Sequence, residues 1–114
     1  MSYNKYGAKK VCCYQGHKHD SKKEAHRCNE LHFLQKGRVI SDLQVQVPFE
    51  LLPSKKYDNM PNERGIKYVA DFVYTRNGIT YIEDTKGMKT LEYIIKRKLV
   101  KDKYCGERVV FKEV

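Results

Sequence analysis

The 114-residue chain carries 23 Lys and Arg against 14 Asp and Glu, a formal net charge of +9, and its length predicts a single domain with one core. The basic excess favours a polyanionic partner. Nucleic acid is preferred over a membrane surface, and a cytosolic location is expected, because the sequence holds no apolar run of membrane-spanning length, no secretory signal and no basic amphipathic helix at either end.

The four cysteines show no paired C-x-x-C spacing, and without an export signal we expect them to be reduced thiols. They are Cys12, Cys13, Cys28 and Cys105. The alternative is a zinc site in which the first two cysteines join His17 and His19. If these cysteines lie on a strand, however, they point to opposite faces.

The first part of the chain predicts a flexible arm, a small hairpin and a helix. Residues 1–10 are polar and basic, and the stretch VCCYQGHKH that follows is typical of a hairpin that turns at its Gln-Gly pair. Residues 20–36 predict a helix that Ser21 caps, with Glu24 three positions later, and Gly37 supplies a left-handed stop.

The middle of the chain predicts three strands and one long loop. Residues 42–51 alternate between apolar and polar side chains, and Pro48 indicates an edge strand or the end of regular pairing. Residues 52–66 have the proline, asparagine and glycine content of a long surface loop, and such loops are often functional. Residues 67–75 and 79–86 predict a hairpin, because Asn-Gly joins two β-rich runs.

The last part of the chain predicts a helix and a final strand. Thr90 caps a helix that runs to about Tyr104, and the closing segment ERVVFKEV is typical of a strand. The helix is expected to turn four apolar side chains inward, namely Leu91, Ile94, Ile95 and Leu99. We therefore expect an α/β fold in a single domain over residues 1–114, with the order α-β-β-β-α-β after an N-terminal hairpin and a mixed sheet flanked by helices.

The Asn-Gly turn sets which residues oppose each other in the predicted hairpin. If it is a two-residue type I′ turn, Arg76 faces Ile79 and, counting back along both strands, Asp71 faces Asp84. Alternate residues share a face, so these aspartates are grouped with Val69, Val73, Thr75, Thr80, Ile82 and Lys86. The reverse face is expected to carry Glu83 with Tyr68, Ala70, Phe72 and Tyr81.

An opposed pair of carboxylates is destabilising unless a positive charge lies between them. Opposed β-carbons lie about 4.5 to 5.5 Å apart, so ionised Asp71 and Asp84 repel each other. Mg²⁺ prefers oxygen ligands and is typically held by one or two carboxylates with waters and substrate phosphate. Lys86 projects from the same face, where it could orient an attacking water or offset charge on phosphorus. These three residues predict phosphodiester cleavage.

The alternative is a pair of solvated acids on an open sheet face, with Lys86 as their ion-pair partner. We prefer the metal site, because Val69, Val73 and Ile82 on the same face indicate that it is covered. Glu24 is a further candidate, because it lies on the inward stripe of its helix and could approach the aspartates. The capping box that begins at Ser21 explains Glu24 equally well without a metal. Gln46 is an auxiliary candidate, and Glu83 on the reverse face is either structural or auxiliary.

Four short motifs together resemble the PD-(D/E)XK nuclease superfamily, in particular its small phage-encoded members. They are Ser-Lys-Lys-Glu on the first helix, Ala-Asp-Phe on one strand, Glu-Asp-Thr-Lys-Gly on the next, and Thr-x-x-Tyr-x-x-Lys opening the second helix. The resemblance covers residues 9–114, and the predicted element order is similar to the core of that superfamily. It implies a nuclease dependent on Mg²⁺ or Mn²⁺, related in design to Holliday-junction resolvases and acting in a phage-infected bacterial host cell.

Carried over to this sequence, the two acids of the motif fall on Asp71 and Asp84, its lysine on Lys86 and the helix-borne acid on Glu24. The sequence departs from the pattern at two positions. Ala70 stands where the name-giving proline would be. Asp84 replaces the more frequent glutamate, which shortens the reach to the metal and leaves room for Glu83 to take its place if the strand slips.

Basic side chains on or near the second helix are expected to contact nucleic-acid phosphates. The set consists of Lys89, Lys96, Arg97 and Lys101, together with Lys22, Lys23 and the arm from Lys5 to Lys10. The free N–H groups of the helix that Thr90 opens could also hold a phosphate. Tyr93 supports the site or contacts the nucleic-acid backbone. For each lysine, a solvated helix face is the alternative.

The sequence thus predicts a Mg²⁺- or Mn²⁺-dependent DNA endonuclease, in which a metal-bound water attacks the phosphodiester in line. So small a domain has little surface for reading bases, so we expect structure-selective cutting, by analogy on branched recombination DNA. Symmetric cleavage of a junction would need a homodimer. The alternative is a non-catalytic nucleic-acid-binding module or an accessory subunit of a phage replication or packaging complex.

Overall fold

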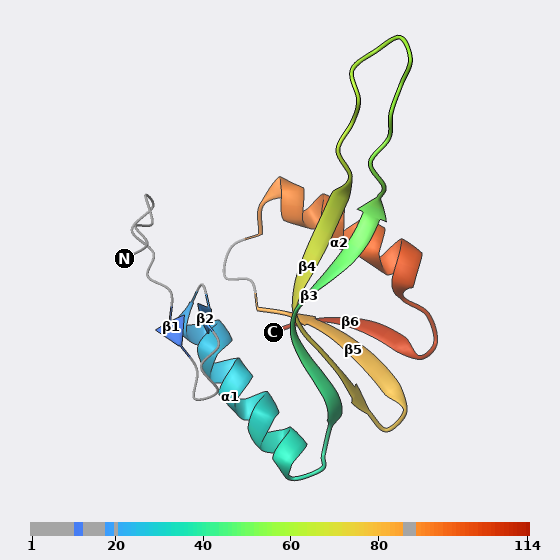
Figure 1. The fold of residues 1–114 in the computed structure, drawn as a ribbon. Coiled ribbons are helices and arrows are strands. Elements are labelled where there is room, and N and C mark those ends of the chain that lie inside the picture. Colours follow the sequence, from blue (N-terminus) through green and yellow to red (C-terminus); the bar gives the residue numbers. More distant parts are fainter. Residues whose placement is uncertain (1–10, 13–17, 20, 86–88) are drawn as a thin grey trace.

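A computed structural model describes residues 11–12, 18–19, 21–85 and 89–114 of the chain (Figure 1). Its elements are β1 (Val11–Cys12), β2 (Lys18–His19), α1 (Lys22–Lys36), β3 (Ser41–Leu52), β4 (Ile66–Arg76), β5 (Ile79–Asp84), α2 (Leu91–Tyr104) and β6 (Val109–Glu113). The predicted order of a small hairpin followed by α-β-β-β-α-β is confirmed. The expected basic arm over residues 1–10 and the turn of the small hairpin lie outside the described residues.

A four-stranded mixed sheet forms the centre of the protein, in the order β3-β4-β5-β6. The pairs β3–β4 and β4–β5 are antiparallel, whereas β5 and β6 run parallel. The expected mixed α/β fold is therefore correct. β3 lies at an edge of the sheet, which accommodates Pro48 opposite Val69, because an edge strand leaves one side of its backbone without a partner strand.

The tight turn between β4 and β5 has the predicted register. Asn77 and Gly78 both have positive φ, at 52° and 78°, as a type I′ turn requires. The ladder then runs from Arg76 opposite Ile79 back to Phe72 opposite Glu83. No residue is inserted, so Asp71 and Asp84 occupy the next position of the hairpin.

Both helices begin at the predicted caps. The Ser21 hydroxyl accepts a hydrogen bond from the Glu24 N–H at 3.1 Å, and the Thr90 hydroxyl accepts one from the Tyr93 N–H at 3.1 Å. The end of α1 differs from the prediction, because Gly37 has a φ of −80° and Arg38, with a φ of 61°, is the left-handed residue.

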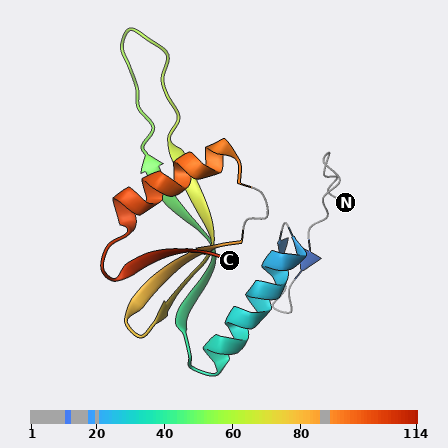
Figure 2. The same cartoon turned by 180° about the vertical axis from the view of Figure 1, so that it is seen from behind.

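The two helices cover opposite faces of the sheet. Phe72 and Tyr74 of β4 pack with the inward side chains of α1, whereas Val73 between them packs with the α2 cluster. Viewed from behind, α2 passes in front of β3 and β4 (Figure 2). The inward stripe of α2 contains buried Tyr93 and Val100.

The predicted inward face of α2 is therefore largely wrong. Leu91, Ile95 and Leu99 are exposed, and only Ile94 of the four packs against the core. The helix carries two apolar stripes, and the sheet covers the stripe that contains Tyr93 and Val100. The buried Tyr93 hydroxyl donates a hydrogen bond to Glu113 of β6. A pattern of apolar residues alone does not say which of two stripes the sheet will cover.

Strict alternation along β4 also fails, at Asp71. Tyr68 and Ala70 were expected on the face of Glu83, but they pack with Ile82 in the α2 cluster. Val69, expected on a covered face, is exposed. The change falls opposite Gln46 of β3, whose φ of 57° lies in the left-handed region. A backbone of that conformation in a strand alters the direction of the side chains around it.

The predicted long loop is an extended projection between β3 and β4. Figure 1 shows it reaching well beyond the sheet, with Lys55 and Glu63 paired across it. Gly65 closes its base, since a β-carbon there would lie 2.7 Å from the carbonyl oxygen of Leu52. No helix among the described residues has the length and apolar character needed to cross a membrane.

Candidate functional site

Asp71 and Asp84 lie together at the end of the β4–β5 ladder, and both are buried, with exposed fractions of 5% and 0%. The Asp71 carboxylate accepts two hydrogen bonds from Thr85, from its backbone N–H and its hydroxyl, each at 2.8 Å. Thr85 directly follows Asp84 in the chain, so these bonds attach Asp71 to the end of β5. The two acids therefore lie close together, as the hairpin register predicted, and neither side chain extends into solvent.

Tyr68 holds the second acid of this pair, Asp84. Its hydroxyl donates a hydrogen bond to Asp84. Burial raises the pKa of this phenol most strongly, and the hydrogen bond to Asp84 and the negative charges of Asp84 and Asp71 raise it further. The phenol therefore stays protonated and remains a donor at neutral pH. Strict alternation had placed this tyrosine on the opposite face, so the sequence prediction missed it.

Glu24 approaches the site through Gln46. The Glu24 carboxylate is buried and accepts a hydrogen bond from the Gln46 side-chain amide at 3.0 Å. Gln46 lies between the pairs Val45–Phe72 and Val47–Ala70, which places it opposite Asp71. The backbone N–H of Glu24 donates to Ser21, as the capping-box interpretation predicts, while its carboxylate contacts Gln46 of β3. In the part of the chain that the structure describes, Glu24 does not form a group with Asp71 and Asp84 that could hold a metal ion, so the predicted set of three acidic ligands is not assembled.

The backbone conformation of Gln46 is a second indication of a functional site at this position. Its φ of 57° is strained for a residue with a side chain, at a cost on the order of 1 kcal/mol or more. Such conformations collect at functional sites. The sequence offered no sign of this strain.

Glu83 belongs to a different structure on the other face of the sheet. It is fully buried and forms a two-point ion pair with Arg27 of α1, in which Nε and one terminal nitrogen donate at 2.7 Å and 2.8 Å. The Tyr74 hydroxyl donates a third hydrogen bond at 2.7 Å. Burial, the bond to Glu83 and its charge raise the pKa of Tyr74 to about 12. Because the strand has not slipped, Glu83 holds α1 to the sheet and does not stand in for Asp84.

The family model described as "Protein of unknown function (DUF1064)" matches residues 3–112. The chain belongs to the DUF1064 family. No curated protein and no solved structure matches it. The match covers almost the whole of this chain.

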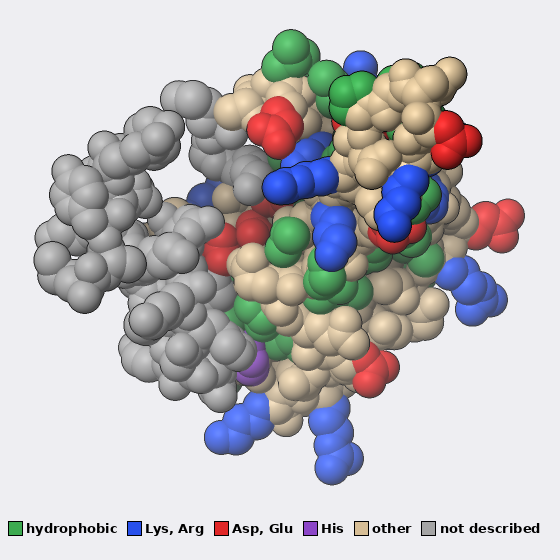
Figure 3. Space-filling model, turned by 45° about the horizontal axis from the view of Figure 1, so that its top comes forward, with side chains coloured by type: hydrophobic (Ala, Val, Ile, Leu, Met, Phe, Trp, Pro, Cys, Tyr) green, Lys and Arg blue, Asp and Glu red, His purple; other side chains and the backbone are tan. Residues whose placement is uncertain are grey.

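The predicted nucleic-acid contacts of this DUF1064 protein divide into exposed and engaged residues. Lys22 and Lys23 are exposed at the start of α1. Lys89 pairs with Glu113 at 3.4 Å, and Lys96 pairs with Glu92 at 3.0 Å. Lys86, the predicted lysine of the motif, lies outside the described residues. Figure 3 shows Lys and Arg side chains beside a group of acidic ones on one face of the molecule.

Glu113 is a fourth acid that the sequence did not single out. In the parallel β5–β6 pair it lies directly beside Asp84. It accepts hydrogen bonds from the Tyr93 hydroxyl at 2.9 Å and from Arg97 at 3.1 Å, and it pairs with Lys89. Burial opposes its ionisation, but these donors and cations outweigh burial and lower the pKa of Glu113. Glu113 lies beside Asp84 only because β6 pairs with β5, two strands that are distant in the sequence.

The donor chemistry at this position fits a hard divalent cation held by few protein ligands. Asp71 and Asp84 supply two carboxylates, and Mg²⁺ commonly uses one or two with waters and phosphate. Over residues 21–85 and 89–114, no group of three or more His, Cys, Asp or Glu side chains is close enough to hold a metal ion. Cys28 and Cys105 are free thiols, and the ligands of the alternative zinc site lie outside the described side chains.

Proposed function

We propose that this protein is a metal-dependent DNA endonuclease that hydrolyses phosphodiester bonds, with Mg²⁺ or Mn²⁺ as its cofactor. The observation that carries the proposal is the burial of Asp71 and Asp84 at one end of a hairpin, with Gln46 opposite Asp71 and hydrogen-bonded to Glu24. Buried acids are rare unless they are paired or bind a cation. Their concentration beside a strained backbone supports a site rather than a structural accident.

The residues of the site have separable roles in the proposed reaction. Asp71 and Asp84 would hold the cation, and Gln46, which lies opposite Asp71, donates a hydrogen bond to the Glu24 carboxylate. Thr85 and Tyr68 hold the two aspartates in position by hydrogen bonds. A bound divalent cation would lower the pKa of a water molecule and neutralise charge that develops on the phosphate. Lys86 follows β5 in the sequence, and its predicted role is to stabilise the charge that develops on the phosphate.

Two further observations support kinship to PD-(D/E)XK nucleases and a nucleic-acid substrate. The helices and strands follow the order α-β-β-β-α-β expected for that core. The net charge of +9 favours a polyanion. Lys22, Lys23 and Lys89 would contact phosphates, as Lys96 would where α2 is not covered by a partner protein, and Thr90 and Tyr93 would support the start of α2. Cutting of Holliday junctions in a phage-infected bacterial cell, by a homodimer, is the form of this activity that we favour.

The second candidate is a non-catalytic nucleic-acid-binding module, or an accessory subunit of a phage replication or packaging complex. One observation favours it. An oxygen of each acid is already engaged by the protein, in Asp71 by Thr85, in Asp84 by Tyr68 and in Glu24 by Gln46. A hydrogen-bonded acid network without a cation would be a stable structural feature.

Cleavage of branched, duplex and single-stranded DNA with Mg²⁺ or Mn²⁺ separates the two candidates. We expect the wild type to cut and Asp84→Asn to lose at least about 100-fold in rate, which is the scale of removing one group that stabilises the transition state. Asp58→Asn, which removes an exposed acid on the projection, is the matched control and should retain activity. Circular dichroism must show that all three proteins are folded. DNA binding without any cutting, by the wild type and the variants alike, would establish the binding module instead.

A further inference from the structure

The outer side of α2 carries an apolar stripe that the core does not use. Leu91, Ile95 and Leu99 are 73%, 50% and 44% exposed, and their spacing of four residues places them along one ridge of the helix. The inward ridge with Tyr93 and Val100 is separate from it. Three consecutive turns of aliphatic surface facing solvent are typical of an interaction site rather than of a monomer surface.

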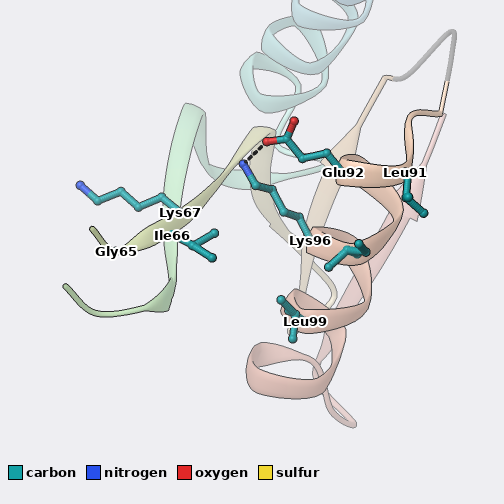
Figure 4. Close-up of a pocket in the computed structure, with 8 residues that line it drawn as sticks. Gly65, Ile66, Lys67, Leu91, Glu92, Lys96 and Leu99 are labelled. Atoms are coloured by element: carbon teal, nitrogen blue, oxygen red, sulfur yellow. Dashed lines mark ion pairs between the residues drawn. The ribbon is translucent and has the colours of Figure 1, made fainter. Parts of the chain in front are cut away.

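This stripe forms one wall of a groove of about 570 Å³, whose other wall is the start of β4. The lining consists of Gly65, Ile66, Lys67, Leu91, Glu92, Ile95, Lys96 and Leu99. Figure 4 shows Ile66 opposite the helix, with the Glu92–Lys96 ion pair at the rim. The groove is thus aliphatic inside and charged at its edge, which resembles the core and rim of a protein–protein interface.

We infer that the groove and the Leu91–Ile95–Leu99 stripe bind the same surface of a second copy of this chain, with the two α2 helices antiparallel. The stripe is symmetric about its middle residue, so a twofold axis near Ile95 places Leu91 of each copy against Leu99 of the other. Ridges of four-residue spacing pack well against each other when helices cross at about −50°. One surface then provides both halves of the interface.

The charges beside the stripe agree with the antiparallel arrangement. Glu92 and Lys96 lie on the same flank of the helix, with Glu92 nearer its N-terminus. An antiparallel partner brings its own Lys96 alongside Glu92, whereas a twofold-related parallel partner would place the two Glu92–Lys96 flanks on opposite sides of the interface, where they could not pair. The aliphatic lining contains no aromatic side chain on which a nucleic-acid base could stack, and Glu92 repels phosphate. A second copy therefore fits this groove better than nucleic acid does.

Analytical ultracentrifugation of the full chain over a broad range of concentrations tests the inference. We expect a concentration-dependent dimer, and Ile95→Glu should raise its Kd by at least about 100-fold, because both copies lose a buried side chain. Phe33→Glu is the matched control. Phe33 is 77% exposed on α1, outside the groove, so this change should leave the Kd as it is. A monomer at every concentration, or a dimer that Ile95→Glu does not weaken, would overturn the inference.

A mixing experiment tests the antiparallel pairing itself. Glu92→Lys and Lys96→Glu each leave like charges on both copies and should weaken self-association. An equimolar mixture of the two variants should form a heterodimer more tightly than either forms a homodimer, since opposite charges then face each other. No gain on mixing would exclude the proposed pairing. These measurements involve no DNA or metal. A monomer would exclude the homodimeric form of the proposed activity but not metal-dependent hydrolysis itself, and loss of cleavage would not exclude the dimer.

Discussion

The buried ion pair between Arg27 and Glu83 allows the sharpest test of how this fold is held together. Glu83 has no exposed surface, and its two oxygens receive two hydrogen bonds from Arg27 and one from Tyr74. Replacing Arg27 by Met keeps an unbranched side chain similar to the aliphatic part of Arg27 and removes the guanidinium group with its charge. The carboxylate of Glu83 would then be a buried negative charge with only the Tyr74 hydroxyl to compensate it.

The expected cost is large relative to the whole stability of the protein. Removing one partner of a buried ion pair costs about 3 to 5 kcal/mol, and a chain of this length has a free energy of unfolding of roughly 6 to 17 kcal/mol. Glu83→Gln should cost less, about 1.5 to 3 kcal/mol, because Arg27 can still reach water. In the double variant no buried charge remains, so Arg27→Met should add little to Glu83→Gln.

Urea denaturation followed by circular dichroism at neutral pH gives the four free energies of this cycle. Glu30→Gln is the matched control, because Glu30 is the exposed second partner of Arg27, and its loss should cost less than about 1 kcal/mol. Additive effects of the two changes, or a cost below about 1 kcal/mol for Arg27→Met, would refute this account. The folded fraction of the Glu83→Gln variant should also retain the proposed DNA cleavage activity, which Asp84→Asn is expected to lose.

Two further predictions concern pH and the base of the projection. The pKa of Tyr74 is raised from 10.0 to about 12, so the folded state keeps a proton that the unfolded state loses, and its contribution to stability is complete below pH 10 and disappears between about pH 10 and 12. Urea midpoints measured through this range should fall less steeply for Tyr74→Phe, and equal slopes would contradict the assignment. Gly65→Ala should cost about 1 to 3 kcal/mol, because its β-carbon would lie 2.7 Å from the Leu52 carbonyl oxygen. Gly106→Ala, which meets nothing within 4 Å, should leave the urea midpoint unchanged, and a similar loss in both variants would show that the close approach is not the cause.

Local signals in the sequence were sufficient to predict the order of the helices and strands and the register of the β4–β5 hairpin. Asn77-Gly78 can adopt the positive φ of a type I′ turn at low cost, so the hairpin register follows from two residues. The hydroxyl groups of Ser21 and Thr90 each accept a hydrogen bond from a free backbone N–H in the first turn of a helix, so both helix starts can be predicted from single residues. Asp71, Asp84 and Glu24 could be named in advance because their positions depend on these short-range features.

Long-range contacts decided the remainder of the site. Tyr68 reaches Asp84 only because the side chains of β4 change direction at Asp71, opposite the strained Gln46. Glu113 lies beside Asp84 only through a parallel pairing that no turn specifies. These positions arise from packing between segments distant in the chain, and periodicity within one segment carries no information about them.

The sequence by itself determined the order of the elements, the hairpin register and the pair of acids, since each depends on backbone preferences within a few residues. The tertiary structure decided which stripe of α2 is buried, which side chain pairs with Glu83, and where the exposed aliphatic surface lies. The physical reason is that burial is a competition between surfaces. Its outcome depends on every element that packs on the sheet, including the contact of Arg27 with Glu83 and of Tyr93 with Glu113.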